Sequence, residues 1–120
     1  MPRDYRKLKT YHLADELVVQ VYTRTKHFPQ EETFGLKSQM RRAAVSIPAN
    51  IAEGAGRRTL REYINFLGLA SGSLSELTYY IELTRRLGYI STQDHSQLCQ
   101  QAEETSRALH GLIQALEKKL

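Results

Sequence analysis

Five arginines are the residues whose type and grouping in this chain could do chemistry. Arg41 and Arg42 are adjacent, and Arg57, Arg58 and Arg61 follow a short glycine-containing stretch. A guanidinium group can bind phosphate through two parallel hydrogen bonds, so these residues predict a nucleic-acid-binding surface. The alternative is a solvated helix face crossed by salt bridges, which is the usual role of such charge runs.

The amino-terminal segment could enlarge this surface. We expect residues 1–9 to form a basic arm that can move relative to the rest of the chain. Its cations are Arg3, Arg6, Lys7 and Lys9. The whole chain has 17 Lys and Arg against 13 Asp and Glu, a net charge of +4. This excess permits nucleic-acid binding without requiring it, so the placement of the charges matters more than their sum.

The sequence contains no pattern typical of a catalytic, metal or cofactor site. No two of the four histidines are four residues apart, and the single cysteine, Cys99, falls beside an apolar heptad, which predicts a buried structural thiol. Residues 54–56 lack the third glycine of a dinucleotide-binding turn, and no Gly-x-Ser-x-Gly sequence is present. We therefore expect no enzymatic activity, no cofactor and no metal.

The spacing of apolar residues predicts four helices, at about 10–26, 34–53, 59–87 and from 91 or 92 to the end. With short connections, they predict a single all-α domain over 1–120, an up-down antiparallel four-helix bundle. Pro48 falls inside the second helix, but the apolar period continues through it. We therefore expect one helix kinked at Pro48. The lone cysteine and the lack of a long apolar run predict a cytoplasmic protein that does not cross a membrane.

A polar stripe runs beside the apolar face of the second helix. We expect it to be a structural network that satisfies backbone groups near Pro48 or the following turn, or that pairs with Arg42 or Arg57. The alternative is a binding surface. The stripe consists of Gln39, Ser46, Asn50 and Glu53.

The third helix has two apolar stripes, although a helix in a four-helix bundle normally buries one. The second stripe predicts a homo-oligomer interface, and the alternative is one wide inner face. Gly68 and Gly72 in the same helix predict close approach of a neighbouring helix, or else room for a ligand. The first stripe is Tyr63, Leu67, Ala70, Leu74, Leu77 and Ile81, and the predicted interface is Phe66, Leu69, Ser73, Tyr80 and Leu83.

Three segments carry a family resemblance. They are residues 39–54 (QMRRAAVSIPANIAEG), residues 62–67 leading into 70–77, and residues 87–90. The chain resembles the bacterial four-helix-bundle proteins encoded by intervening sequences in large-subunit ribosomal RNA genes. The resemblance implies a ring-like homopentamer without catalytic residues. This family is similar to the accessory variability protein of diversity-generating retroelements, a basic pentamer that binds a reverse transcriptase and nucleic acid.

Together these observations predict a non-enzymatic, oligomeric accessory protein that binds RNA or DNA. It would assist a reverse transcriptase or act on ribosomal RNA. The alternative function is a protein–protein scaffold or adaptor that does not bind nucleic acid.

Overall fold

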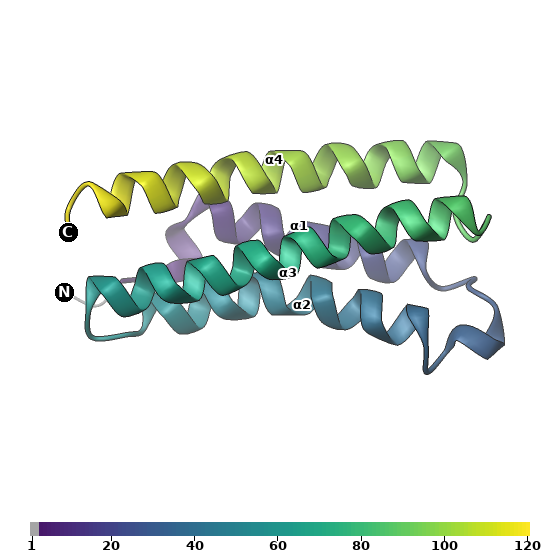
Figure 1. Cartoon of the computed structure of the whole chain (residues 1–120), viewed down its shortest axis with the longest axis horizontal. Helices are drawn as coiled ribbons and strands as arrows, with labels where there is room; N and C mark the ends of the chain where they lie inside the picture. Colours follow the sequence, from purple (N-terminus) through teal and green to yellow (C-terminus); the bar gives the residue numbers. More distant parts are fainter. Residues whose placement is uncertain (1–2) are drawn as a thin grey trace.

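The computed structural model describes residues 3–120, and its principal helices form an antiparallel bundle. They are α1 (Lys9–Arg24), α2 (Leu36–Ala55), α3 (Leu60–Arg86) and α4 (Thr92–Glu117). The helices run alternately in opposite directions, and each packs against two neighbours, α1 against α2 and α4, and α3 against α2 and α4 (Figure 1). No strand occurs within 3–120. The predicted all-α four-helix bundle is therefore confirmed.

Short 3-10 turns complete the architecture. Tyr5–Lys7 (η1) precedes α1, and Gln30–Glu32 (η2) lies in the connection between α1 and α2. The particle measures 46 × 24 × 20 Å. None of the helices in this part of the chain has the apolar length that crossing a bilayer requires.

A side-chain cap marks the start of α3, and a backbone cap at a glycine marks its end. The Thr59 hydroxyl accepts a hydrogen bond from the Glu62 backbone N–H at 3.1 Å, and donates one to the Glu62 carboxylate at 3.1 Å. At the other end, Gly88 has a φ of 79°, and the Tyr89 N–H bonds the Thr84 carbonyl at 2.9 Å. A left-handed glycine with this bond satisfies carbonyl groups that the helix leaves free. The predicted start and end of the third helix are thus explained by local chemistry.

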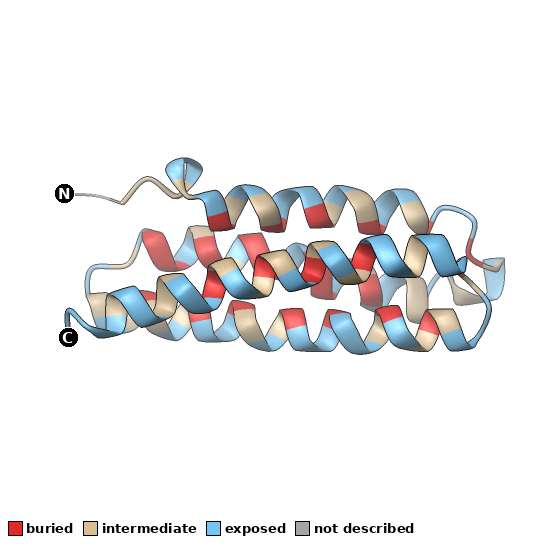
Figure 2. Cartoon of the chain, turned by 90° about the horizontal axis from the view of Figure 1, so that it is seen from above, coloured by how far each residue is buried: buried red, intermediate tan, exposed pale blue. Residues whose placement is uncertain are grey.

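The core lies along the bundle axis, where each helix contributes one buried stripe (Figure 2). All six residues of the first apolar stripe of α3 are buried. Burial of apolar side chains in this way is the main favourable contribution to folding. From the other helices the core includes Leu17, Val21, Met40, Ile47, Ile51, Leu98 and Leu109.

Pro48 lies within a continuous α2 and is buried. The prediction of one helix rather than two is confirmed, and the kink stays a prediction. Proline has no N–H, so it leaves the carbonyl of Ala44 without its usual helical donor. The Asn50 side chain donates to the carbonyl of Ser46 at 2.8 Å, not to that of Ala44.

Gly54 packs α2 closely against α3. The sequence places Gly54 at the end of the second helix, but α2 continues through it to Ala55. A Cβ atom at this position would lie 2.7 Å from the Cβ of Phe66 and 3.1 Å from the Cδ1 of Tyr63. Gly54 is therefore a packing residue, because only a residue without a side chain allows this separation of the two helices.

Candidate nucleic-acid interface

The structure divides the five predicted phosphate-binding arginines between two places. Arg41 and Arg42 lie in the first turns of α2, whereas Arg57, Arg58 and Arg61 lie around the turn between α2 and α3. Fifteen helical residues at about 1.5 Å each put roughly 22 Å between the two groups. The two groups therefore do not form one continuous cluster.

Arg41 caps the carboxyl end of α1. Its Nε donates to the Thr25 Oγ1 at 2.8 Å, its Nη2 donates to the Tyr22 carbonyl at 3.1 Å, and its guanidinium lies 4.3 Å from the centroid of the Tyr22 ring. Thr25 is fully buried. A cation that bonds free carbonyls at a helix end stabilises that end, so Arg41 has a structural role in this chain.

Replacing Arg41 by alanine is expected to lower the free energy of unfolding by about 1–3 kcal/mol, because the charge-assisted hydrogen bonds to the end of α1 disappear. Denaturant unfolding followed by circular dichroism measures this. Arg42→Ala is the matched control: Arg42 is exposed and its Nη2 bonds Gln39 at 2.6 Å, so we expect a change within about 0.5 kcal/mol. Equal stability of the two variants would contradict the capping role.

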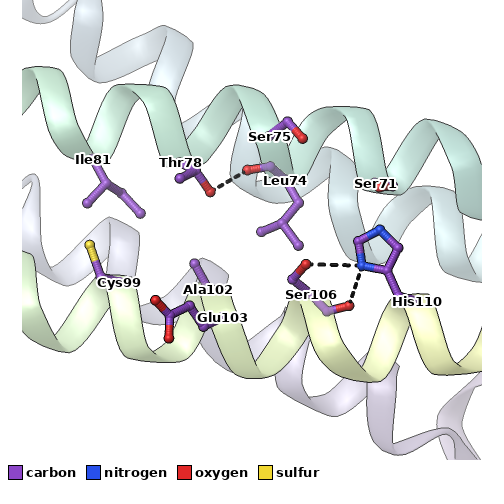
Figure 3. Close-up of a pocket in the computed structure, with 10 residues that line it drawn as sticks. All are labelled: Ser71, Leu74, Ser75, Thr78, Ile81, Cys99, Ala102, Glu103, Ser106 and His110. Carbon is purple, nitrogen blue, oxygen red and sulfur yellow. Dashed lines mark hydrogen bonds between the residues drawn. The ribbon is translucent and has the colours of Figure 1, made fainter.

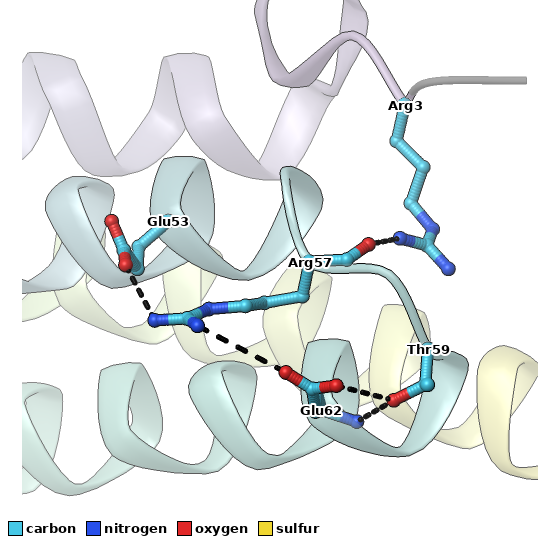
Figure 4. A network of polar contacts seen from close by, with 5 residues as sticks. All are labelled: Arg3, Glu53, Arg57, Thr59 and Glu62. Carbon is cyan, nitrogen blue, oxygen red and sulfur yellow. Dashed lines mark hydrogen bonds and ion pairs between the residues drawn. The ribbon is translucent and has the colours of Figure 1, made fainter.

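Arg57 belongs to a surface network at the α2–α3 turn (Figure 4). Its guanidinium lies 2.7 Å from the Glu53 carboxylate and 3.9 Å from that of Glu62, and 4.6 Å from the centroid of the Phe66 ring. The backbone carbonyl of Arg57 accepts a hydrogen bond from Arg3 at 2.8 Å. The charge of Arg57 is therefore largely satisfied within the chain.

Arg58 and Arg61 are exposed, and no protein side chain in the described residues bonds their guanidinium groups. They lie at the amino end of α3, which is the positive end of the helix dipole. Cations at this position reduce the stability of the helix unless an anion is present. Among the five predicted arginines, these two are the most available to a phosphate.

The amino-terminal arm joins the same end of the molecule. Arg3 bonds Arg57 and stacks 4.8 Å from the centroid of the Tyr63 ring, and η1 leads directly into α1. Burial raises the pKa of the Tyr63 hydroxyl, and Arg3 partly offsets this effect. Asp4 accepts hydrogen bonds from Arg6, which lower the pKa of Asp4. The mobility of the arm stays a prediction.

The amino-terminal arm, the α2–α3 turn and the carboxyl end of the chain therefore bring cations to the same end of the bundle (Figure 1). Within residues 3–9, 56–61 and 118–120, the sequence has one acidic residue, Asp4. Sequence reasoning did not assign the last two lysines to this surface, although an up-down topology by itself puts them there. The cations of this basic end are Arg3, Arg6, Lys7, Lys9, Arg57, Arg58, Arg61, Lys118 and Lys119.

The predicted polar network consists mainly of local pairs on the flank of α2. Gln39 bonds Arg42, Asn50 bonds the Ser46 carbonyl, and Glu53 bonds Arg57. The hydroxyl of Ser46 crosses to α3, where it bonds the hydroxyl of Ser73. Gln39 and Glu53 are exposed, so the stripe lies at the surface rather than in the core.

The second apolar stripe of α3 lies at the edge of the core, and its Tyr80 packs against the core residues. Phe66 and Ser73 are half-buried against α2. Tyr80 and Leu83 are not buried either, and Leu69 is 57% exposed. The chain's own helices thus cover this predicted interface incompletely.

Gly68 and Gly72 lie on the outer surface of α3. A Cβ atom at either position would have no neighbour within 4 Å. The predicted close approach of a neighbouring helix is therefore wrong within this chain. Helix-interior glycines cost stability, and nothing within residues 3–120 packs against these two to offset that cost.

A groove with a volume of about 240 Å³ separates α3 from α4, and Cys99 lines it with Ser71, Ser106 and His110 (Figure 3). Cys99 is half-buried rather than part of the core. Its pKa is raised by burial and by the carboxylates of Glu82 and Glu103. The Nε2 of His95 lies 3.5 Å from the Cys99 sulfur and 2.9 Å from Glu82. In a catalytic triad the histidine faces the nucleophile with one ring nitrogen and the carboxylate with the other. Here Nε2 of His95 faces both Cys99 and Glu82, so this arrangement does not activate the thiol.

The fold and its surface define a class, an antiparallel four-helix bundle with several cations gathered at one end, some of them paired with carboxylates. A family model described as 23S rRNA-intervening sequence protein matches residues 6–111. The chain belongs to this family, which confirms the resemblance found in the sequence. The relation to the retroelement accessory protein stays a prediction.

Comparison with solved structures finds the same architecture. A protein with unknown function from the S23 ribosomal protein family, from Bacteroides thetaiotaomicron, superposes with a TM-score of 0.81 at 25% sequence identity. The match covers 88% of this chain and 95% of that one. No curated protein matches the chain.

Proposed function

We propose that this chain is a non-enzymatic, oligomeric accessory protein that binds nucleic acid through the basic end of its bundle. The observation that carries the proposal is the convergence of three cationic segments on that end, where Glu53 and Glu62 pair with Arg57 while Arg58 and Arg61 are exposed. Clustered Lys and Arg attract the phosphate backbone regardless of base sequence. Arg58 and Arg61 support it further, since an anion at the amino end of α3 would offset their unfavourable position.

The family name refers to intervening sequences in 23S ribosomal RNA, so structured RNA is the first nucleic acid to consider. Pentameric assembly, a cytoplasmic location and a reverse transcriptase as protein partner belong to the same proposal. The pentamer and the reverse transcriptase are supported by the resemblance in residues 39–54, and the assembly also by the incompletely buried second stripe of α3. The cytoplasmic location is supported by the single cysteine.

The test is the binding of fluorescently labelled RNA hairpins and DNA duplexes by the purified protein, followed by anisotropy. We expect binding at low salt and a linear fall of the logarithm of affinity against the logarithm of salt concentration. The slope for duplex DNA should be about 0.9 for each phosphate that the protein neutralises. A chain that binds neither probe at low salt would contradict the proposal.

A second candidate is a protein–protein scaffold without nucleic-acid binding. It is favoured by the exposed apolar side chains of α3, where Tyr79 is 61% and Leu69 57% exposed. Such side chains are enriched at protein interfaces. An assembled protein that purifies free of nucleic acid, and binds none at low salt, would favour the scaffold.

A further inference from the structure

A second basic surface lies at the opposite end of the bundle from the α2–α3 turn. It is an open groove with a volume of about 520 Å³ between the last turns of α1 and the first turns of α2. Aromatic and apolar side chains alternate with cations along it. The lining residues that matter are Tyr22, Phe34, Lys37, Arg41, Arg42 and Val45.

Phe34 is the most unusual residue of this groove. Its side chain is 94% exposed, in the connection just before α2, whereas Tyr22 and Val45 are 40% exposed. Phenylalanine is among the residues whose burial contributes most to folding, but the fold does not bury this one. Phe34 is therefore not required by the core of this chain.

The electrostatics of the groove favour an anion. Lys37, Arg41 and Arg42 line it, and no acidic side chain in the described part of the chain does. Glu32, the nearest acid in sequence, is turned away, since its carboxylate accepts hydrogen bonds from the Leu36 N–H and the Tyr89 hydroxyl, each at 3.0 Å. Glu76 lines a neighbouring hollow with Arg42 but not this groove. The groove's own lining therefore complements a polyanion.

The aromatic part of the groove is held in place. The guanidinium of Arg41 lies over the Tyr22 ring and is itself fixed to the end of α1. Tyr22 therefore presents a ring of defined orientation, beside the free ring of Phe34. Arg41 caps the end of α1, so Lys37 and Arg42 are the cations of the groove that can pair with a ligand.

We propose that this groove binds an unpaired stretch of polynucleotide, with a base stacked on Phe34 and phosphates beside Lys37 and Arg42. Grooves that combine aromatic rings with cations bind single strands, because each base offers a face for stacking and each linkage a negative charge. A duplex cannot use the rings, since its bases are stacked on one another. The inference rests on the proposed function and adds to it a preference for single-stranded segments.

The test compares single-stranded RNA, single-stranded DNA of the same sequence and the corresponding duplex, each bound to wild type and to variants at position 34. Phe34→Ala should weaken binding of single strands about tenfold or more and leave duplex binding unchanged. Phe34→Leu keeps the apolar character but not the aromatic face, and should lose affinity as alanine does. Tyr79→Ala removes another exposed ring, on α3 and outside the groove, and should leave the affinity for single strands unchanged.

Phe34→Trp gives a direct signal, because the chain has no other tryptophan. It should keep the affinity for single strands, and its fluorescence should be quenched when a base stacks on it. Comparing single-stranded RNA with single-stranded DNA of the same sequence shows whether the sugar affects the affinity. Folding is not at risk in these variants, since the side chain at position 34 is exposed.

Several results would overturn the inference. If Phe34→Ala binds single strands like wild type while Arg58→Ala/Arg61→Ala weakens single strands and duplex alike, the groove is excluded and the proposed function stands. If Phe34→Ala instead changes the mass of the assembly, the ring is an anchor for a protein, and the inference is wrong. If wild type binds no polynucleotide at low salt, the inference and the proposed function both fail.

Discussion

Gly54→Ala is expected to lower the free energy of unfolding by about 1–3 kcal/mol, the range typical of overpacking. The added methyl group would lie 2.7 Å from the Cβ of Phe66 and 3.2 Å from the carbonyl oxygen of Tyr63. Neither atom is the flexible end of a side chain, so the backbones of α2 and α3 must separate. Denaturant unfolding measures the change as a lower midpoint at an unchanged m-value.

Gly111→Ala is the control for this prediction. Gly111 lies inside α4, and a Cβ atom there would meet nothing within 4 Å. Alanine is the better helix former, so stability should rise by up to about 1 kcal/mol. We expect Gly54→Ala to lower the free energy of unfolding and Gly111→Ala to raise it. A gain at Gly54 similar to that at Gly111 would show that α2 and α3 do not approach as closely as described.

The double variant Arg58→Ala/Arg61→Ala is expected to lower the salt dependence of duplex binding, by roughly 0.9 in the log–log slope for each phosphate that the variant no longer neutralises. Stability should stay the same or rise slightly, because two cations leave the positive end of α3. Anisotropy titrations across salt concentrations measure the slope, and thermal unfolding measures stability. Weaker binding at unchanged stability separates a binding role from a structural one.

Arg85→Ala/Arg86→Ala is the matched control, since it removes the same charge from the opposite end of the same helix. Its slope should equal that of wild type. If both double variants weaken binding equally, the effect comes from net charge alone, and the basic end is not the interface.

The helices could be predicted from the sequence because their signals are local. Apolar periodicity indicated four segments, and Thr59 with Glu62, together with Gly88, marked the ends of α3. The packing role of Gly54 could not be predicted, since it depends on how closely two helices approach. For the same reason the exposed positions of Gly68 and Gly72 were not foreseen.

The candidate site was only partly predictable. The residue types indicated phosphate binding, but five similar arginines have different surroundings. Arg41 bonds the end of α1, Arg57 pairs with Glu53, and Arg58 and Arg61 face solvent. These differences arise from how each arginine sits relative to neighbouring helix ends and carboxylates. The exposure of Phe34 depends on the conformation of the connection before α2, which periodicity does not describe.

The proposed assembly depends on the incompletely buried apolar surface of α3, and the mass of the protein in dilute solution tests this proposal most directly. Sedimentation or light scattering on a dilution series should give a multiple of 13.8 kDa, five times that value if the assembly is the pentamer implied by the resemblance. Leu69→Glu should reduce the mass to that of one folded chain, because it puts a charge on the exposed stripe. A wild-type protein that is helical and remains a single 13.8 kDa chain at every concentration would contradict the account.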